Sequence, residues 1–164
     1  MGDALAIALL SKRGFKKEDF AFFHPGGTLG RHLLLRVSDI MHHGDAVPMV
    51  HEETPLHQVV LEMTEKKMGM TTVIRKNRTL VGVITDGDLR RLLLSGHANP
   101  TQLFALPAKA VMTTHPKKIR QEALIVEAMH LMETYAITTV VVEDDAESVI
   151  GVVHLNDIIR TKSA

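Results

Sequence analysis

From residue 37 onward, apolar and polar positions follow the same order twice along this chain. In each copy, a stretch with apolar residues every three or four positions precedes two runs of β-branched residues and a second helical stretch. The first pattern predicts an amphipathic helix and the second a β-hairpin. A period of about seventy residues is too long for a solenoid repeat and fits two copies of a small α/β unit.

Each copy is predicted to be a β-α-β-β-α unit. In the first copy, Val37–Ile40 supplies a short strand or an irregular segment, and Thr54 is predicted to cap a helix that has Pro55 at its first position. The later elements of this copy are predicted over residues 72–75, 80–85 and 87–95. Those of the second copy are predicted over residues 122–134, 138–143, 148–153 and 155–162.

The fold class expected is therefore α+β, with two three-stranded sheets, each carrying two helices, related by an approximate two-fold axis. Two units of one sequence usually pack face to face, so the cleft between them is the place expected for a ligand. The predicted divisions are an N-terminal segment, a first unit, a linker and a second unit, over residues 1–34, 35–96, 97–108 and 109–164. The N-terminal segment is set apart because it holds most of the phenylalanines.

Composition narrows the class of partner. The formal charge is zero, and aromatic residues make up only 4% of the chain, so a nucleic-acid partner is not expected. The absence of cysteine excludes thiolate chemistry and disulfides and fits a reducing cytoplasm. The longest apolar run, Ala4–Leu10, is too short to span a bilayer, and no secretory cleavage signal follows it. A cytoplasmic protein with no membrane partner is expected.

The segment Gly82–Asp88 carries the sharpest local signal for a ligand. A strand is predicted to end at Thr85, and Asp88 follows in the first turn of a helix, where free N–H groups suit a phosphate. A carboxylate three residues after a hydroxyl can hold the hydroxyls of a ribose. The same spacing is that of a capping box that only stabilises the helix, and both interpretations stay open. The second copy keeps the carboxylate as Asp157 but has His154 in place of the hydroxyl, so the two half-sites are not equivalent.

Other polar residues carry weaker signals. Arg90 and Arg91 point in different directions on a helix, so at most one faces the cleft, as an anion partner or as a solvated side chain. His24 lies in a rigid His-Pro-Gly-Gly turn that presents either a catalytic imidazole or an exposed loop. Four further histidines lack the spacing of any zinc motif, and no metal site is expected. These are His42, His43, His51 and His57.

The duplicated unit, with Gly-Val-Ile-Thr-Asp-Gly-Asp at 82–88, resembles a tandem pair of CBS motifs (a Bateman module) over residues 37–162. A more specific resemblance is to the C-terminal portion of D-arabinose 5-phosphate isomerases. It rests on the segments Met1–Ala6, Glu18–Phe20, His24–Arg31, Ser38–Met41 and Thr85–Arg91. In that family a sugar isomerase (SIS) domain precedes a CBS pair, so the resemblance implies that residues 1–34 are a helical remnant of the SIS domain.

The resemblance implies a parent reaction that interconverts D-ribulose 5-phosphate and D-arabinose 5-phosphate through an enediol, for synthesis of the lipopolysaccharide sugar Kdo. It places the family's active-site histidine at His24, whereas the family's catalytic lysine and glutamates lie upstream of Met1. We therefore do not expect this chain to catalyse the isomerisation by itself. It is expected to be an excised regulatory part, or a reading frame begun at an internal methionine.

The resemblance also implies a nucleotide ligand in the cleft, held by Thr85, Asp88 and Asp157. No cofactor is expected to be required, and the expected ligands are AMP, ATP and CMP-Kdo, the nucleotide sugar that ends the parent pathway. CBS pairs commonly dimerise, so a homodimer is expected, with a higher oligomer for the full enzyme. The alternative is an architectural CBS pair that joins subunits and binds no ligand.

Overall fold

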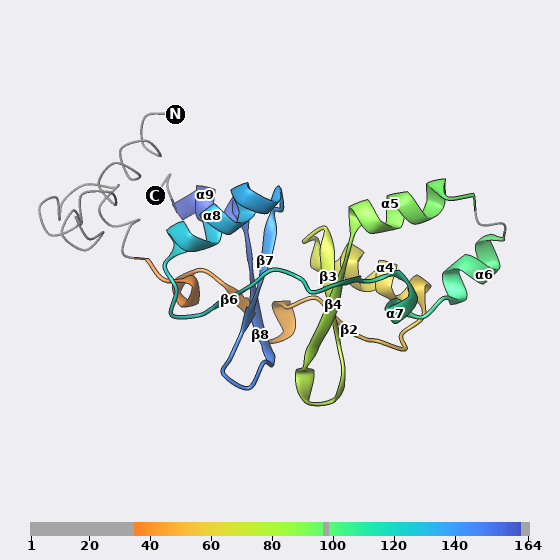
Figure 1. Cartoon of the computed structure of the whole chain (residues 1–164), viewed down its shortest axis with the longest axis horizontal. Coiled ribbons are helices and arrows are strands. Elements are labelled where there is room, and N and C mark those ends of the chain that lie inside the picture. The colour runs from red at the N-terminus through yellow and green to blue at the C-terminus, as the bar shows by residue number, and fades with distance from the viewer. Residues whose placement is uncertain (1–34, 97–98, 162–164) are drawn as a thin grey trace, which may run out of the picture.

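The computed structural model describes residues 35–96 and 99–161. The predictions made for residues 1–34, including the helical remnant and His24, lie outside the described residues. The described part forms two four-stranded sheets. The sheets lie side by side, with their hairpin turns at one end and helices α5 (Asp86–Leu94), α8 (Ile125–Tyr135) and α9 (Leu155–Thr161) at the other (Figure 1). The predicted α+β class is confirmed.

Each sheet takes three strands from one copy and one strand from the other. Along the first sheet the order is β2 (Met49–His51), β3 (Met70–Ile74), β4 (Leu80–Thr85) and β5 (Thr113–Thr114). Along the second sheet the order is β1 (His42–His43), β8 (Val149–His154), β7 (Thr139–Glu143) and β6 (Lys118–Arg120). Because β1 belongs to the first copy and β5 to the second, the copies exchange short strands. The prediction of two three-stranded sheets was wrong in this respect.

The segment predicted as the first strand, Val37–Ile40, is instead a short 3-10 turn, η1 (Val37–Asp39). Its N–H groups bond to the other copy: Val37 N donates to Ala123 O at 2.8 Å, and Ser38 N donates to Gln121 O at 2.9 Å. In a strand, these two N–H groups would instead have donated to a neighbouring strand. The third strand of this unit is β2, which runs parallel to β3.

Two glycines at equivalent places make the exchange possible. A Cβ at Gly82 in β4 would lie 2.7 Å from Met112 Sδ and 2.9 Å from Thr113 O. A Cβ at Gly151 in β8 would lie 2.7 Å from His42 O. Because side chains do not tolerate contacts this short, only glycine lets the exchanged strand approach.

An apolar seam joins the two sheets. On the second sheet Val141, Val149 and Val152 are at most 1% exposed. They share a core with first-copy residues Val47, Met68, Met70, Ile74 and Val83. Burying one valine side chain contributes about 1.5 kcal/mol or more, so the two halves form one folding unit.

The helix α4 (Leu56–Lys66) begins later than predicted, with Pro55 rather than Thr54 at its N-cap. The first helical N–H, that of Leu56, donates to Leu106 O at 2.8 Å. The linker therefore satisfies a donor at this helix start, and no side chain caps the helix there.

The predicted linker contains ordered structure. Helix α6 (Pro100–Ala105) begins after Asn99, whose Oδ1 accepts from Thr101 N at 2.9 Å. The remaining short elements are α7 (Ala108–Val111), η2 (Gly44–Ala46) and η3 (Lys76–Arg78). Within the described ranges, no helix has the length and apolar character needed to cross a bilayer.

Replacing Gly82 with Ala is expected to lower the free energy of unfolding by about 2 kcal/mol, because the new methyl group collides with the exchanged strand β5. Urea unfolding monitored by circular dichroism measures the change. The matched control is Gly87→Ala in α5, where the nearest atom to the new Cβ is Arg91 Nη1 at 3.4 Å. Alanine should be neutral or slightly stabilising there, and an equal loss in both variants would contradict the strand-exchange argument.

Candidate functional site

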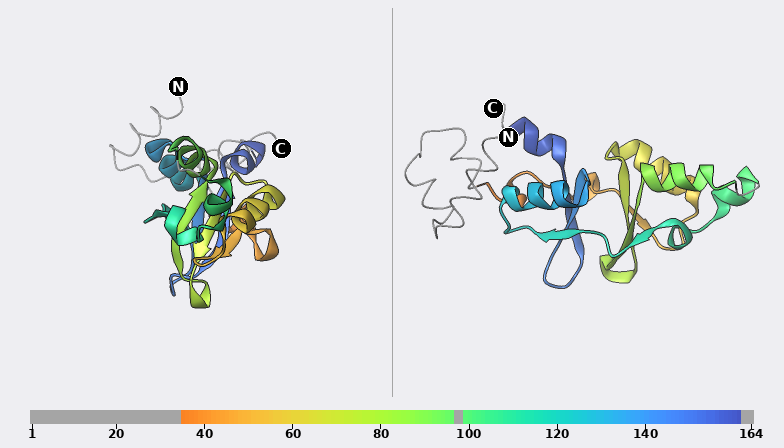
Figure 2. Two further views of the ribbon diagram at one scale, coloured as in Figure 1. Left: turned by 90° about the vertical axis from the view of Figure 1, so that its right-hand side faces the viewer. Right: turned by 45° about the horizontal axis from the view of Figure 1, so that its top comes forward.

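A cavity of about 740 Å³ opens between the two halves of the fold. The first half contributes the junction of β4 and α5, and the second contributes the end of α8 and the start of β7. A further wall comes from residues 113–117, called here the strap, which run between α7 and β6 and cross from one half to the other (Figure 2). The cavity therefore lies in the cleft predicted from the repeat.

Thr85 and Asp88 form a capping box at the start of α5. Thr85 Oγ1 accepts from Asp88 N at 3.2 Å, and Asp88 Oδ2 accepts from Thr85 N at 2.8 Å. The Thr85 hydroxyl also donates to Asp88 Oδ2 at 2.7 Å. The capping interpretation of this motif is therefore correct. Both residues also line the cavity, so capping does not exclude contact with a ligand.

Two groups outside the box also hold the Asp88 carboxylate. Arg91 Nη2 donates to Oδ1 at 2.5 Å, and Thr113 Oγ1 donates to the same oxygen at 3.1 Å. Because Thr113 lies on the exchanged strand β5, the second copy contributes directly to this half-site. Burial by itself raises the pKa of Asp88, but hydrogen bonds from Thr85, Arg91 and Thr113 outweigh burial and hold that pKa below its ordinary value.

The equivalent half-site of the second copy is built differently. His154 Nδ1 lies 3.1 Å from Asn156 N and accepts its hydrogen. Asp157 Oδ2 lies 2.8 Å from Nε2 of His42, which the exchanged strand β1 brings to it as β5 brings Thr113 to Asp88. His154 lines the cavity, whereas Asp157, predicted to bind the ligand with Asp88, lies outside it. The two carboxylates differ in their cross-copy partner, which is the hydroxyl of Thr113 for Asp88 and the imidazole of His42 for Asp157.

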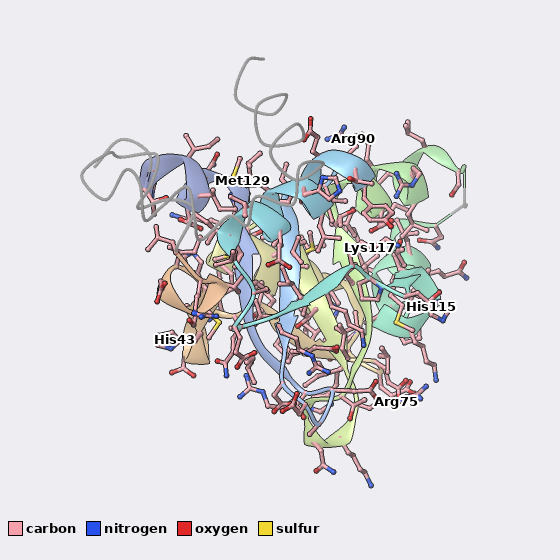
Figure 3. All side chains as sticks on the ribbon, turned by 60° about the vertical axis from the view of Figure 1, so that its left-hand side comes forward. His43, Arg75, Arg90, His115, Lys117 and Met129 are labelled. Atoms are coloured by element: carbon pink, nitrogen blue, oxygen red, sulfur yellow. The ribbon has the colours of Figure 1, made fainter. Side chains whose placement is uncertain are left out.

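Of the two consecutive arginines, only Arg91 lines the cavity. Arg90 is exposed at the surface of α5 (Figure 3). This agrees with the prediction that at most one of them faces the cleft. The Arg91 side chain is 73% exposed, so its ion pair with Asp88 can open to water at small cost.

The strap is the part of the site that sequence reasoning missed. Its His115 and Lys117 line the cavity, and Figure 3 shows both on this segment. Lys117 Nζ lies 4.0 Å from the ring centroid of Tyr135, in a cation–π contact. The signal that could have found the strap is the repeat itself, because the strap is equivalent to residues 42–46 of the first copy, which begin with β1. The charged and histidine side chains around the cavity are Lys67, Asp86, Asp88, Arg91, His115, Lys117 and His154.

Two histidines of the first loop contact different partners and do not form a common site. His42 pairs with Asp157, and His57 Nδ1 lies 3.3 Å from Phe104 O. Among residues 35–96 and 99–161, no group of three or more His, Asp or Glu side chains is arranged to hold a metal ion.

Residues 37–95 and 108–163 match the CBS domain family. The chain is 47% identical over 160 residues to arabinose 5-phosphate isomerase KdsD of Escherichia coli (strain K12), and 46% identical over 160 residues to KdsD of Pseudomonas aeruginosa. Both alignments cover 98% of this chain, but they cover 47% and 48% of those relatives. The chain thus spans about half the length of the curated relatives it matches.

Two solved structures show the same architecture. CBSX2 in complex with AMP has a TM-score of 0.67 and 25% identity, covering 76% of this chain and 93% of that one. The CBS domain pair of MJ0100, in complex with 5′-methylthioadenosine and S-adenosyl-L-methionine, has a TM-score of 0.66 and 20% identity, covering 77% and 94%. At 20% identity, the likeness to the MJ0100 pair shows a shared fold and nothing more. Together they confirm the predicted tandem CBS architecture.

Replacing Asp88 with Asn is expected to lower the free energy of unfolding by about 2 kcal/mol at neutral pH, because its donors lose a charged acceptor. Since the folded-state pKa of Asp88 is lowered, the carboxylate stabilises the fold fully above the unfolded-state pKa of about 4. That contribution is lost as the pH falls through the lower, folded-state pKa. Urea unfolding should therefore show the difference between wild type and D88N shrinking below about pH 4.

The control for this experiment is Asp145→Asn, at a fully exposed position on the turn between β7 and β8. It should change stability by no more than about 0.5 kcal/mol at any pH. A D88N deficit that stayed constant down to about pH 2 would contradict the argument from the pKa.

Proposed function

This chain belongs to the CBS domain family, and from that membership we propose that it is the regulatory nucleotide-binding pair of an arabinose 5-phosphate isomerase. In the whole enzyme, an upstream SIS domain would interconvert D-ribulose 5-phosphate and D-arabinose 5-phosphate. The described residues then have no catalytic task. Their task is to bind a nucleotide and transmit its presence to the rest of the enzyme.

The cavity between the two halves carries this proposal. Its volume of about 740 Å³ lies within the range of small-molecule sites. Both halves line it, so a bound molecule makes contacts that depend on how the halves are arranged. A ligand with different affinity for two arrangements shifts the population between them, which is the physical requirement for a sensor.

The walls of the cavity suit the three parts of a nucleotide. Met70, Val83 and Ile137 offer apolar surface for a base. Asp88 supplies acceptor oxygens for a ribose, and Arg91 supplies a cation for a phosphate. The likeness to CBSX2, whose structure contains AMP, supports an adenine nucleotide as one candidate.

Binding of a ribose requires a change at Asp88. The carboxylate offers about four acceptor positions, and four hydrogen bonds already occupy them: two from Thr85, one from Arg91 and one from Thr113. A ribose hydroxyl must therefore displace one donor. Arg91 is the donor that leaves most easily, because its side chain is largely exposed. Once released, Arg91 is free to pair with the phosphate of the same ligand.

Calorimetric titration of this chain with AMP, ATP and CMP-Kdo tests the proposal. CMP-Kdo is included because an end product of the parent pathway is a natural feedback signal. Saturable binding of at least one of the three supports the proposal. No heat from any of them at about 1 mM would contradict it, since weaker binding would not serve regulation.

An architectural role is the second candidate, and exposed apolar side chains favour it. Leu93 and Leu94 on α5 are 65% and 81% exposed, and Phe104 on α6 is 41% exposed. Such a surface suits contact with another subunit, in a homodimer of this chain and a higher oligomer of the enzyme. The variant Asp88→Ala separates the two roles. If the chain is a sensor, the variant loses the response to the nucleotide. If the chain is purely architectural, there is no response to lose and the variant keeps its assembly state.

Replacing Arg91 with Ala is expected to affect adenosine and AMP in opposite directions. Adenosine should bind more tightly, because its ribose meets a carboxylate with a vacant acceptor position. AMP should bind about tenfold more weakly, because its phosphate loses the arginine. Calorimetry with both ligands measures both changes. Arg90→Ala, next in sequence but outside the cavity, should leave both affinities unchanged, and parallel changes for the two ligands in R91A would contradict the exchange at Asp88.

A further inference from the structure

His115, in the middle of the strap, is one of six non-glycine residues in the described part of the chain that have a positive φ. Its φ is +55°, in the left-handed region where Cβ is crowded by a carbonyl oxygen. The next residue is Pro116, whose ring further restricts the residue before it. Strained conformations of this kind persist only where the surrounding structure imposes them, and they cluster at ligand sites.

The first copy has a glycine at the equivalent position. Strands β5 and β1 pair beside Gly82 and Gly151, and they are followed directly by His115 and Gly44. Gly44 has nearly the same φ, +60°, and a Cβ there would meet no atom within 4 Å. Glycine, which adopts this φ without strain, is therefore compatible with the fold at the position after the exchanged strand. The second copy has a histidine instead, at the position that borders the cavity.

The His115 ring keeps one nitrogen free for a ligand. Its Nδ1 lies 3.3 Å from Thr114 Oγ1, whereas Nε2 has no hydrogen-bond partner in the described part of the chain. Of the other cations that line the cavity, Arg91 must first leave Asp88 before it can join His115 at a phosphate, and Lys117 lies over the ring of Tyr135. His115 can therefore donate to a ligand without breaking a bond of its own at Nε2.

We propose that His115 binds the phosphate of a nucleotide in this cavity and so distinguishes a nucleotide from its nucleoside. The proposal rests on the proposed function, in which the cavity binds nucleotides. A ring N–H is a directional donor to a phosphate oxygen, and a protonated ring adds charge. Gly44 of the first copy supplies neither the N–H donor nor the charge. Contact with a phosphate would account for a histidine at the strained position of the second copy.

The test is His115→Gly, which gives the second copy the glycine that the first copy has at the equivalent position. AMP and adenosine are titrated by calorimetry into wild type and variant. The variant should bind AMP about tenfold more weakly, through loss of a hydrogen bond to a charged group, and should bind adenosine as wild type does. Because glycine adopts this backbone freely, the midpoint of thermal unfolding should not fall. Equal losses for both ligands, or no loss for AMP, would overturn the proposal.

The matched control is Gly44→His, which places the same strained residue in the other copy, away from the cavity. It should lower the thermal midpoint by a few degrees and leave AMP affinity unchanged. Weaker AMP binding in G44H would show that AMP affinity follows the stability of the fold and would overturn the phosphate contact. If wild type binds neither AMP nor adenosine, and neither ATP nor CMP-Kdo, the proposed function fails. If wild type binds AMP and H115G binds it equally well, only the role of His115 fails.

Discussion

The carboxylate of Asp88 is the interaction on which the site depends. Asp88 is 9% exposed, and its carboxylate accepts hydrogen bonds from the end of β4, from α5 and from β5 of the other copy. An unpaired charge at this depth would be costly, so the three elements are held in one arrangement. A ligand that competes for this carboxylate therefore acts on the helix start, on the strap and on the contact between copies together.

The duplication does not produce two equal sites. The exchanged strands bring Thr113 to Asp88 and His42 to Asp157, at equivalent places. A threonine hydroxyl is short and leaves room beside the carboxylate, whereas the imidazole of His42 reaches over Asp157 and pairs with it. The cavity described above lies beside Asp88, and Asp157 is not among the residues that line it.

The sequence predicted those features that depend on neighbours along the chain. The hairpin strand over residues 80–85 matches β4, and the capping box of Thr85 and Asp88 is present, because both are set by local periodicity and helix-end chemistry. The features it failed to predict depend on distant partners. Val37 forms a turn because its N–H bonds to Ala123, and Thr54 does not cap α4 because the linker does. The pairing of Asp157 with His42 is a further contact of this kind, since nothing near Asp157 in sequence indicates His42.

The exchange of β1 and β5 also constrains how such a chain arises and changes over generations. A lone copy would have a groove over its sheet glycine with no strand to fill it, and its acidic side chain would lack its cross-copy partner. An identical chain could supply both, so a single-copy ancestor would have had to assemble in pairs. Within one chain, by contrast, each half can carry its own substitutions at equivalent places. Histidine in place of glycine after β5, and histidine in place of threonine at the end of β8, are differences that a symmetric dimer of identical chains could not have held.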